Sequence, residues 1–573
     1  MAMHAYALKK PHTEEEKNEL KEYPELLQEL LMNRGVRTKE EADTFLNPNY
    51  DTHLHDPFLI KDMGKAVSRI LRAIEKGERI AIWSDYDCDG IPGGVLLHDF
   101  FKKIAYANVL NYIPHRHNEG YGLNVNAIDT LKGDGVSLIV TVDVGITDVE
   151  QVKHANKHSI DVVITDHHLP NGTLPPAYAV VNSKREDDTY PFDQLCGSGV
   201  AYKLVQALIQ KGDFGLTPGW EKWLLDVAGL ATIADMVPLV GENRVLAYYG
   251  LKVLRKSPRK GLIKLYRKMN LEQRTITEDD VGYMIAPRIN AASRMDRPEE
   301  AFRLLATDDD VEAGILADHL HKINNERKGT VAAMVREIKK EVGSRGEKDV
   351  IVIGNPKWRP ALLGLAANTL VEEYGKTVCL WGEEGLSTQA GGRVLKGSCR
   401  SNGSVNVVEL MKRSESILIE YGGHQFSGGF SVTREHIHRL EEVFLDSYTH
   451  AKQKEHDTAI VVDKKLWLDD VTSDTYRLIE RLAPFGEGNP KPTFLFEGVE
   501  ISGVRHFGKG NDHLELTFQS ENGKTIPAIV FFKGENDFNV TIKPGAKIHL
   551  VAHIEHSTFG RTQGLRLRIV DIR

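Results

Sequence analysis

Short apolar runs alternate with amphipathic stretches over the first third of the chain. Four runs are rich in Val, Ile and Ala: ERIAIWSD (78–85), VSLIVTVD (136–143), IDVVITD (160–166) and YAVVN (178–182). Stretches with apolar residues at helical spacing lie between and before them, such as KAVSRILRAIEKG and DVEQVKHANKHS. Apolar strands that alternate with helices are typical of βαβ units around a parallel sheet covered on both faces. We therefore predict an α/β domain over residues 61–297.

Different patterns precede and follow this region. Residues 1–60 hold short helical patterns and predict a helical leader, while residues 298–345 predict connecting helices with a strongly polar surface. A second, smaller α/β pattern covers residues 346–452. Short strand patterns separated by turns fill residues 457–573 and predict a small β-barrel.

Composition and charge restrict the class of protein. A length of 573 residues suits about three to four domains, and 41% hydrophobic with 27% charged residues is typical of folded cores. The opening MAMHAYALKKP has no apolar signal segment and no run approaches the ~18 apolar residues of a membrane span, so we expect a soluble, cytoplasmic protein. The four cysteines form no C-x-x-C pair, which argues against a disulfide framework or a thiolate zinc site. Because the net charge is −8, a site that binds a polyanion would have to be a local basic patch.

Acidic and imidazole side chains gather where the predicted strands end. They are Asp85, Asp87 and Asp89 in SDYDCDG, Asp143 in TVDVG, and Asp166, His167 and His168 in TDHH. The carboxyl ends of parallel strands share one edge of a sheet, where ligands bind, so we expect these groups to converge. Asp235 lies in the apolar run LATIADMVPL. Because a buried lone carboxylate is costly, we expect it to face the same cluster.

The residue types in this cluster indicate the metal. DYDCDG resembles the start of an EF-hand loop, but the twelfth position from Asp85 is Leu96 instead of the required Glu, which argues against Ca²⁺. Carboxylates and imidazole without a thiolate pair suit Mn²⁺ or Mg²⁺ better than Zn²⁺. Two such ions can activate a bridging water and hold the attacking and leaving oxygens of a phosphodiester. The cluster therefore predicts a site for two divalent ions, Mn²⁺ or Mg²⁺.

An ordered series of motifs resembles the DHH phosphoesterase family, and in particular its single-stranded-DNA exonucleases. The series is DYDCDG, YIPHRHNEGYGLN, TVDVGIT, DHH, LCGSGVAYKL, LATIADMVPL, PRINAASR, GSCRS, GGH and PFGEGNP. The resemblance implies a DHH domain, a long connecting helix, a DHH-associated domain and an OB-fold. It also implies 5′→3′ hydrolysis of single-stranded DNA in DNA repair and recombination. A single-strand-binding protein and a helicase are the implied candidate partners, and we expect a monomer.

The resemblance also assigns roles to single residues. The implied metal ligands are Asp87, Asp89, Asp143, His167 and Asp235. His168 is expected to contact the scissile phosphate, with Asp85 beside it as a second catalytic residue. The residues expected to bind phosphates and the terminal nucleotide are Arg116, Arg288, Arg294, Ser398, Arg400 and His424. Arginine offers a planar fork suited to phosphate oxygens, although each of these arginines has a surface salt bridge as its alternative role.

Three positions depart from the family pattern. Arg359 in WRPALLGLAA stands where the family usually has His, GGHQFSGG replaces an Ala-rich continuation, and DYDCDGIPGG lacks a run of small or hydroxyl residues after the first motif. None removes an implied metal ligand. The departures concern substrate preference more than chemistry.

Two other functions stay open at this point. The first is a DHH phosphodiesterase that acts on short oligoribonucleotides or cyclic dinucleotides, and the additional C-terminal β-rich domain argues for longer strands instead. The second is a non-catalytic nucleic-acid-binding replication factor, and the presence of all implied ligands argues against it.

Two further features have both a binding and a structural interpretation. Eight basic residues and no acidic one lie between Lys252 and Lys268, which suits either a nucleic-acid backbone or a solvated helix face. Aromatic residues of the predicted barrel suit either a base-stacking platform or its core; they are Phe507, Phe518, Phe531, Phe532 and Phe559.

Overall fold

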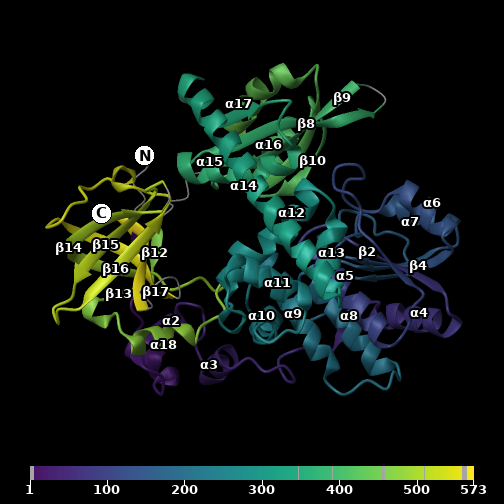
Figure 1. Cartoon of the computed structure of the whole chain (residues 1–573), viewed down its shortest axis with the longest axis horizontal. Coiled ribbons are helices and arrows are strands. Elements are labelled where there is room, and N and C mark those ends of the chain that lie inside the picture. Colours follow the sequence, from purple (N-terminus) through teal and green to yellow (C-terminus); the bar gives the residue numbers. More distant parts are fainter. Residues whose placement is uncertain (1–5, 346–347, 390–391, 453–458, 509, 558–563) are drawn as a thin grey trace.

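The first domain is built on a five-stranded, all-parallel sheet with the strand order β3-β2-β4-β5-β6. The computed structural model describes residues 6–345, 348–389, 392–452, 459–508, 510–557 and 564–573 (Figure 1). The strands are β2 (Arg79–Ser84), β3 (Val109–Tyr112), β4 (Val136–Val142), β5 (Asp161–Thr165) and β6 (Ala179–Val181). Four of them correspond to the predicted runs. The edge strand β3 was not predicted, because its four residues are only half-buried and carry no continuous apolar signal.

Helices cover both faces of this sheet. Ile80 and Ile82 of β2 belong to one core with α4 (Met63–Lys76), α5 (Gly90–Lys103) and α8 (Gly197–Lys211). Ala81 and Trp83 point to the other face and pack with α6 (Val125–Gly133) and α7 (Val149–Lys157). Successive residues of a strand point to opposite faces, so burial on both faces explains the uninterrupted apolar runs.

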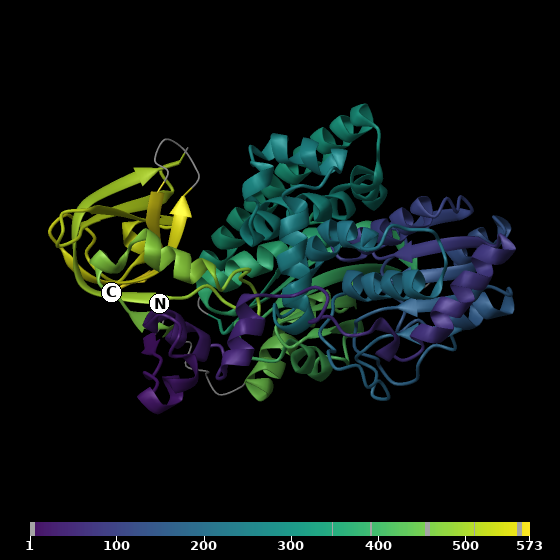
Figure 2. The same ribbon diagram turned by 90° about the horizontal axis from the view of Figure 1, so that it is seen from below.

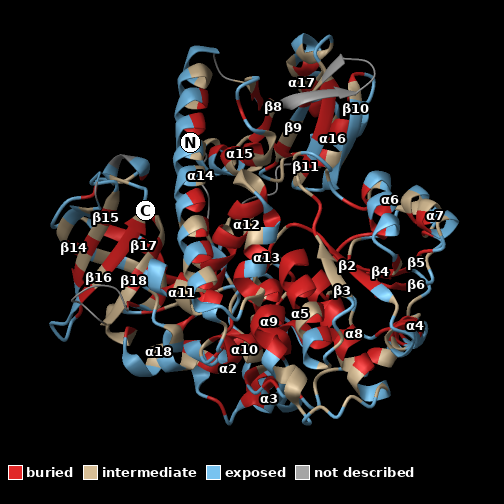
Figure 3. Ribbon diagram, turned by 45° about the vertical axis from the view of Figure 1, so that its right-hand side comes forward, coloured by how far each residue is buried: buried red, intermediate tan, exposed pale blue. Residues whose placement is uncertain are grey.

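Further helices extend the first core and lead to the second domain. They are α9 (Leu225–Ala234), α10 (Gly241–Leu254), α11 (Lys260–Met269), α12 (Ala286–Met295) and α13 (Pro298–Ala306). The 36-residue helix α14 (Asp310–Arg345) follows and runs from the first domain to the second (Figure 3). Leu316 and Leu320 near its start belong to the first core, whereas Met334 and Ile338 pack with the second domain. This is the predicted connector.

The second domain has a five-stranded mixed sheet with the order β10-β11-β9-β8-β7. Its strands are β7 (Val350–Gly354), β8 (Thr377–Gln389), β9 (Gly392–Arg400), β10 (Leu418–His424) and β11 (Ser427–Thr433). Only β7 and β8 run parallel among the described pairs. Helices α15 (Pro360–Tyr374), α16 (Val407–Arg413) and α17 (Leu440–Ala451) pack on this sheet.

The cysteines are free, as expected, but two of them are neighbours. Cys379 of β8 and Cys399 of β9 are opposite each other in the antiparallel register, with their sulfur atoms 2.8 Å apart. The two cysteines are far apart in the sequence, so the sequence alone did not predict that they are neighbours.

The C-terminal domain is a closed barrel. Its strands are β14 (Phe494–Phe507), β15 (His513–Gln519), β16 (Thr525–Phe531), β17 (Lys547–Ser557) and β18 (Gly564–Ile572). Antiparallel pairing of β14 with both β15 and β17 closes the ring, and β16 pairs in parallel with β18. Phe494, Phe518 and Leu550 are fully buried in its core. Closure removes the unpaired strand edges of an open sheet.

The N-terminal segment belongs structurally to this barrel. Strand β1 (Tyr6–Leu8) pairs in parallel with β12 (Ile460–Val462), and helices α2 (Glu25–Met32) and α3 (Lys39–Leu46) contribute side chains to the barrel core. Figures 1 and 2 show both chain ends at the barrel. The predicted leader therefore completes the C-terminal domain. The predicted boundaries at 346 and between 452 and 457 touch residues outside the described ranges.

No helix in the described part of the chain is both long and apolar enough to span a membrane.

Candidate metal centre and phosphate-binding residues

The loop after β2 is folded tightly and aims its carboxylates at the sheet edge. Gly90 is required here, because a Cβ at this position would lie 2.5 Å from the carbonyl oxygen of Asp85. Asp87 Oδ1 accepts hydrogen bonds from the backbone N–H groups of Asp89 (2.8 Å) and Gly90 (3.2 Å). These bonds fix one oxygen of Asp87, as in other Asx turns.

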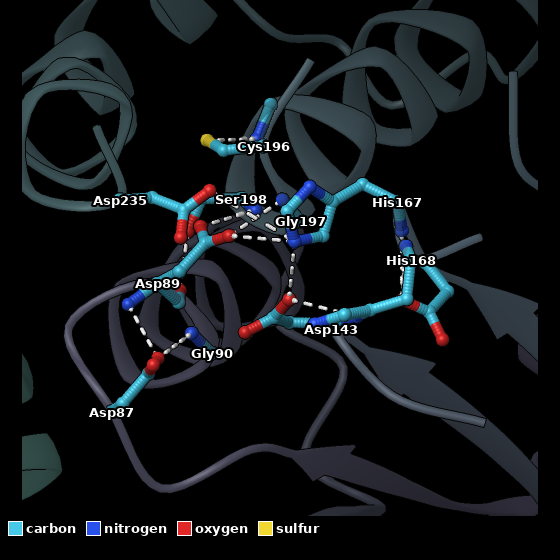
Figure 4. Close-up of polar contacts among 12 residues, drawn as sticks. Asp87, Asp89, Gly90, Asp143, His167, His168, Cys196, Gly197, Ser198 and Asp235 are labelled. Atoms are coloured by element: carbon cyan, nitrogen blue, oxygen red, sulfur yellow. Dashed lines mark hydrogen bonds and ion pairs between the residues drawn. The ribbon is translucent and has the colours of Figure 1, made fainter. Parts of the chain in front are cut away.

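Asp89 is held by the N-terminus of α8. Its carboxylate accepts the N–H groups of Gly197 (2.6 Å) and Ser198 (2.7 Å), and its backbone oxygen accepts the Ser198 hydroxyl (2.5 Å; Figure 4). The orphan N–H groups of a helix start favour such an anion. Burial and the neighbouring Asp87 nevertheless raise the pKa of Asp89 to about 6.

Asp143 follows β4 in a left-handed backbone conformation (φ 63°). It lies against Gly197, where an added Cβ would be 2.5 Å from the Asp143 Cβ, so only glycine fits beside it. Burial, followed by the charge of Asp89, raises the pKa of Asp143 well above its ordinary value. A strained residue of this kind requires support from its surroundings, and Gly197 leaves room for it.

His167 lies at the centre of the cluster. Its Nε2 atom is 3.2 Å from Asp143, 3.8 Å from Asp89 and 3.9 Å from Asp235 (Figure 4). Burial lowers the pKa of His167 to about 3, which keeps the imidazole neutral and its lone pair available to a metal. Asp235 is the C-cap of α9 and not an interior helix residue, and burial raises its pKa to about 9. The predicted convergence of these four residues is confirmed.

Asp166 has an orienting role that the sequence did not reveal. It is fully buried and accepts hydrogen bonds from the N–H groups of Ile146, His167 and His168 and from the His168 ring nitrogen Nδ1 (2.8 Å). Burial alone would raise the pKa of Asp166, but the bond with His168 and its charge hold it below the usual value. The same bond raises the pKa of His168 in spite of burial.

His168 differs from His167 in its access to solvent. Its side chain is 38% exposed, against 10% for His167. Tyr121, which was not predicted, places its hydroxyl 3.3 Å from His168 Nδ1 and 3.3 Å from the backbone oxygen of Asp143. Asp166 and Tyr121 therefore hold the Nδ1 side of the His168 ring, while part of the side chain stays open to solvent.

The donor set fits divalent cations. Three overlapping groups have ligand atoms within 4.8 Å of one another: Asp85, Asp87 and Asp143; Asp89, His167 and Asp235; and Asp143, His167 and His168. The buried Oδ1 atoms of Asp85 and Asp143 have no hydrogen-bond partner among the described residues. Carboxylates crowded in this way repel one another unless cations or protons neutralise them. Oxygen donors with one buried imidazole suit Mn²⁺ and Mg²⁺.

Arg294 and Arg400 lie where the first and second domains meet. Arg294 of α12 donates to the backbone oxygen of Ala361 in α15 (3.0 Å). Burial, then the charges of Arg116 and Arg327, lowers the pKa of Arg294. Arg400 of β9 donates to Ser398 Oγ (2.9 Å) and to the backbone oxygen of Cys399 (2.8 Å), and burial lowers its pKa as well. Within the described ranges, neither guanidinium forms an ion pair with a carboxylate.

Other cations join this junction. Arg288 is only 4% exposed and donates to the backbone oxygen of Met284 (2.6 Å) and to His321 of α14 (3.3 Å). Arg327 of α14 donates to Asn324, and burial lowers its pKa. Arg327 was not predicted, because the polar surface of α14 gives no sign of which side faces the junction. No salt bridge of Arg288 or Arg327 is present in the described part of the chain.

Arg116 and His424 are the remaining predicted phosphate ligands. The Arg116 guanidinium carbon lies 4.7 Å from the centre of the Tyr86 ring, a cation–π contact. His424 ends β10 with an exposed side chain. Arg359, the departure from the family pattern, is the N-cap of α15 and is also exposed. The phosphate contacts of all six residues, Arg116 and His424 included, stay predictions.

Part of the basic run between Lys252 and Lys268 has a structural role. Arg259 pairs with Asp226 (2.7 Å) and Asp99 (2.7 Å), while Lys264 and Lys268 pair with carboxylates of α14. These contacts attach α11 to its neighbours. The other five basic residues of the run form no ion pair in the described chain, so for them the choice between a nucleic-acid surface and a solvated helix face stays a prediction.

The barrel aromatics divide into two groups. Phe518 is core, whereas Phe507 and Phe531 each contact His513 edge to face, with ring centres 5.0 Å from it. Phe532 beside them is 78% exposed, and the Arg568 guanidinium lies 4.0 Å over Phe531. Phe559 lies outside the described residues.

The parallel sheet with its Asp and His residues at the carboxyl edge, followed by a mixed-sheet domain and a barrel, defines a DHH-type phosphoesterase architecture. Residues 79–232 match the DHH family N-terminal domain, residues 347–448 the DHHA1 domain and residues 462–571 the RecJ OB domain. The chain belongs to the RecJ family of the DHH proteins. This confirms the resemblance seen in the motifs and the predicted fold class.

Relatives cover nearly the whole chain. The single-stranded-DNA-specific exonuclease RecJ of Bacillus subtilis is 35% identical over 95% of this chain and 67% of its own length. The enzyme of the same name from Escherichia coli is 30% identical over 83% of this chain and 84% of its own. The crystal structure of Thermus thermophilus RecJ in complex with Mn²⁺ superposes with a TM-score of 0.82 at 26% identity, covering 99% of this chain and 79% of that one. A Mg²⁺ complex of the same protein also matches, with a TM-score of 0.77.

Proposed function

We propose that this chain is a metal-dependent exonuclease that hydrolyses single-stranded DNA in the 5′→3′ direction. The observation that carries the proposal is the convergence of Asp87, Asp89, Asp143, His167 and Asp235 at one sheet edge, beside cations that have no carboxylate partner in the described chain. The names of the RecJ relatives support the substrate, and the family resemblance supports the polarity.

Two divalent ions, Mn²⁺ or Mg²⁺, are the cofactors that we propose. Two of the ligand groups share no residue: Asp85, Asp87 and Asp143 on one side, and Asp89, His167 and Asp235 on the other. When bound, such ions lower the pKa of a water and neutralise the attacking and leaving oxygens. The N-terminus of α8 fixes Asp89, and burial keeps His167 neutral, so both ligands are ready before an ion arrives.

His168 is the residue that we assign to the scissile phosphate. Asp166 occupies its Nδ1 atom and favours the protonated ring, which leaves the opposite nitrogen as a donor toward solvent. A donor at this place can stabilise the negative charge that develops on a phosphoryl oxygen. Asp85 has a ligand atom within 4.8 Å of those of Asp87 and Asp143 and a buried oxygen without a partner, so we assign it to the metal more directly than to the substrate.

The junction cations provide the binding site for the strand. The charge of Asp87 acts on Arg294, as do those of Arg116, Arg327 and Arg400, so the metal cluster and the cations adjoin. We assign Ser398 and Arg400 to the terminal phosphate and Arg294 and Arg288 to phosphates near the scissile bond. A group that holds the strand's end beside the metal ligands converts phosphodiester hydrolysis into removal of terminal nucleotides.

The barrel distinguishes this proposal from the alternatives. Phe532 is exposed, and Phe507, Phe531 and Arg568 beside it are half-buried; this aromatic and cationic group suits stacking with bases of a longer strand and would not be needed for a dinucleotide. The complete ligand set argues against a non-catalytic replication factor. Interaction with a single-strand-binding protein or a helicase, and the monomeric state, are predictions from the resemblance.

The test is degradation of single strands labelled at either the 5′ or the 3′ end, with Mn²⁺, Mg²⁺ or EDTA. We expect metal-dependent release of the 5′ label first and faster turnover of a long strand than of a dinucleotide. Release of the 3′ label first would reject the polarity. Preference for the dinucleotide would favour the small-substrate alternative, and binding without hydrolysis would favour the non-catalytic one.

A further inference from the structure

Helices α6 and α7 lie on the outer side of the first domain (Figure 1), and a second group of residues that could hold a metal ion lies on them. Asp129 of α6 is 2.6 Å from His154 Nε2 and 3.4 Å from His158 Nε2, measured at its Oδ1 atom. The two imidazole rings have their centres 4.6 Å apart. Ligand atoms of all three residues lie within 4.8 Å of one another.

The helix geometry preorganises this group. His154 and His158 are four residues apart, at the end of α7 and at its C-cap, so both rings project from the same side of the helix. The opposite sides of α6 and α7 are anchored by apolar residues such as Ile128, Leu131 and Val152 on the sheet. The two helices therefore cannot easily separate, and the three ligands stay together.

Solvent reaches the group, which is a condition for loading an ion. The side chains of Asp129, His154 and His158 are 51%, 25% and 40% exposed. Lys153, the cation next to His154, forms an ion pair with Glu150 at 2.7 Å. Its charge is thus partly neutralised by a residue on its own helix.

We propose that Asp129, His154 and His158 bind a divalent transition-metal ion of the Zn²⁺ type, which ties α6 to α7. Tetrahedral coordination with bonds of about 2.0–2.1 Å places ligand atoms about 3.3–3.5 Å apart. The pair of Asp129 with His158 already has that spacing, and the pair with His154 requires a small widening. Two imidazoles and one carboxylate leave a fourth position to water.

The ligand types separate this site from the proposed catalytic centre. Imidazole nitrogens select Zn²⁺, Ni²⁺ or Cu²⁺, whereas a set dominated by carboxylates selects Mg²⁺ and Mn²⁺. A third group, Asp296, Glu300 and His319, has two carboxylates and only one imidazole. The charges of Arg297 and Arg303 also act on Glu300, which disfavours a cation there.

The experiment is equilibrium dialysis of the full chain, stripped of metal, against Zn²⁺ with Mg²⁺ in excess, followed by elemental analysis. The variants are His154→Ala/His158→Ala, His167→Ala in the catalytic cluster, and Lys153→Ala as the matched surface control. We expect the double variant to bind one Zn²⁺ fewer than the wild type and Lys153→Ala to bind as much. His167→Ala should retain the equivalent that the double variant loses.

Thermal unfolding gives an independent readout, because an ion that binds only the folded state raises Tm. Zn²⁺ should raise Tm more in the wild type than in the double variant, and Mn²⁺-dependent hydrolysis should be the same in both. Equal zinc content in the wild type and the double variant would overturn the proposal. If the double variant fails to fold, His158→Gln at the more exposed ring replaces it, and an unchanged zinc content in that variant would count equally against the site.

Discussion

The metal cluster of the first domain and the cations of the domain junction are opposite in charge and alike in one respect. In both, several like charges lie close together, and some of the charged groups have no direct partner in the described chain: the Oδ1 atoms of Asp85 and Asp143 accept no hydrogen bond, and Arg294 and Arg400 form no ion pair with a carboxylate. Burial raises the pKa of Asp143 and lowers that of Arg294, so each cluster is unfavourable without a ligand.

Some other buried charges in the molecule are paired within the protein. Lys203 and Glu242 are almost completely buried and form an ion pair, and Arg259 is enclosed by Asp226 and Asp99. Buried ions that are paired in this way serve the structure, whereas like charges crowded together without such pairs are an arrangement that a bound ion of opposite charge would stabilise. The proposed function fits both clusters, because divalent ions would neutralise the carboxylates and the phosphates of a strand would neutralise the junction cations.

The largest expected effect follows from removing one carboxylate of the metal cluster. Asp143→Asn should lower the hydrolysis rate about 10³-fold or more, because metal-ion catalysis supplies several kcal/mol of transition-state stabilisation. Single-turnover release of a 5′ label measures the rate. Binding of a single strand in EDTA should stay within about threefold of wild type, since the junction cations are untouched. A rate within a factor of ten of wild type would show that Asp143 is no essential ligand.

The corresponding change at the junction is Arg400→Gln. Loss of a charge-assisted hydrogen bond to phosphate, worth about 1.5–3 kcal/mol, should raise KM about 10- to 100-fold and change kcat less. The increase should be larger for a strand with a 5′ phosphate than for one with a 5′ hydroxyl. Arg477→Gln is the matched control, because Arg477 pairs with Asp474 on an exposed helix. Equal KM values for both variants would contradict the assigned role.

A smaller change tests how closely the junction is packed. A Cβ at position 364 would lie 2.6 Å from Arg400 Nη2 and 3.2 Å from Ser398 Oγ, so Gly364→Ala should displace the guanidinium and not the backbone. We expect KM to rise about threefold to tenfold, as for a weakened hydrogen bond of ~1 kcal/mol. Gly329→Ala on α14 meets nothing within 4 Å and serves as the control. Unchanged KM in Gly364→Ala would show that the orientation of Arg400 is unimportant.

The smallest effect concerns stability. Without metal, Asp143→Asn should raise Tm by about 2–4 °C, because one of the mutually repelling carboxylates is removed and ~1 kcal/mol shifts Tm by this amount. Mn²⁺ should raise Tm of the wild type more than that of the variant. Differential scanning calorimetry with EDTA or Mn²⁺ measures both. A metal-free variant less stable than the wild type would mean that the cluster is not destabilised by its own charges.

Sequence patterns predicted the parts of the fold that depend on burial and periodicity. The apolar runs identified β2, β4, β5 and β6, and the position of Asp87, Asp143 and His167 after their strands predicted the metal cluster. Strand β3 was not predicted, because an edge strand of four half-buried residues has no strong hydrophobic pattern. The helical character of residues 310–345 was predictable, but which of its side chains reach the junction depends on how α14 is rotated.

The remaining site residues depend on contacts between distant segments. Asp166 stands in the same motif as His167, and spacing does not distinguish a residue that holds the ring of a neighbour from a metal ligand. Gly197 and Ser198 hold Asp89 through their backbone N–H groups, which any residue type possesses. The pairing of Asp89 with α8 therefore became visible only in three dimensions.

The parallel pairing of β1 with β12 has a mechanical consequence. A force that pulls on β1 acts directly on β12, the strand that precedes the barrel and lies more than 450 residues later in the chain. A pull on a tag or fusion placed ahead of Tyr6 would therefore act first on the barrel domain, whereas cutting the chain after Leu46 would remove side chains from the barrel core.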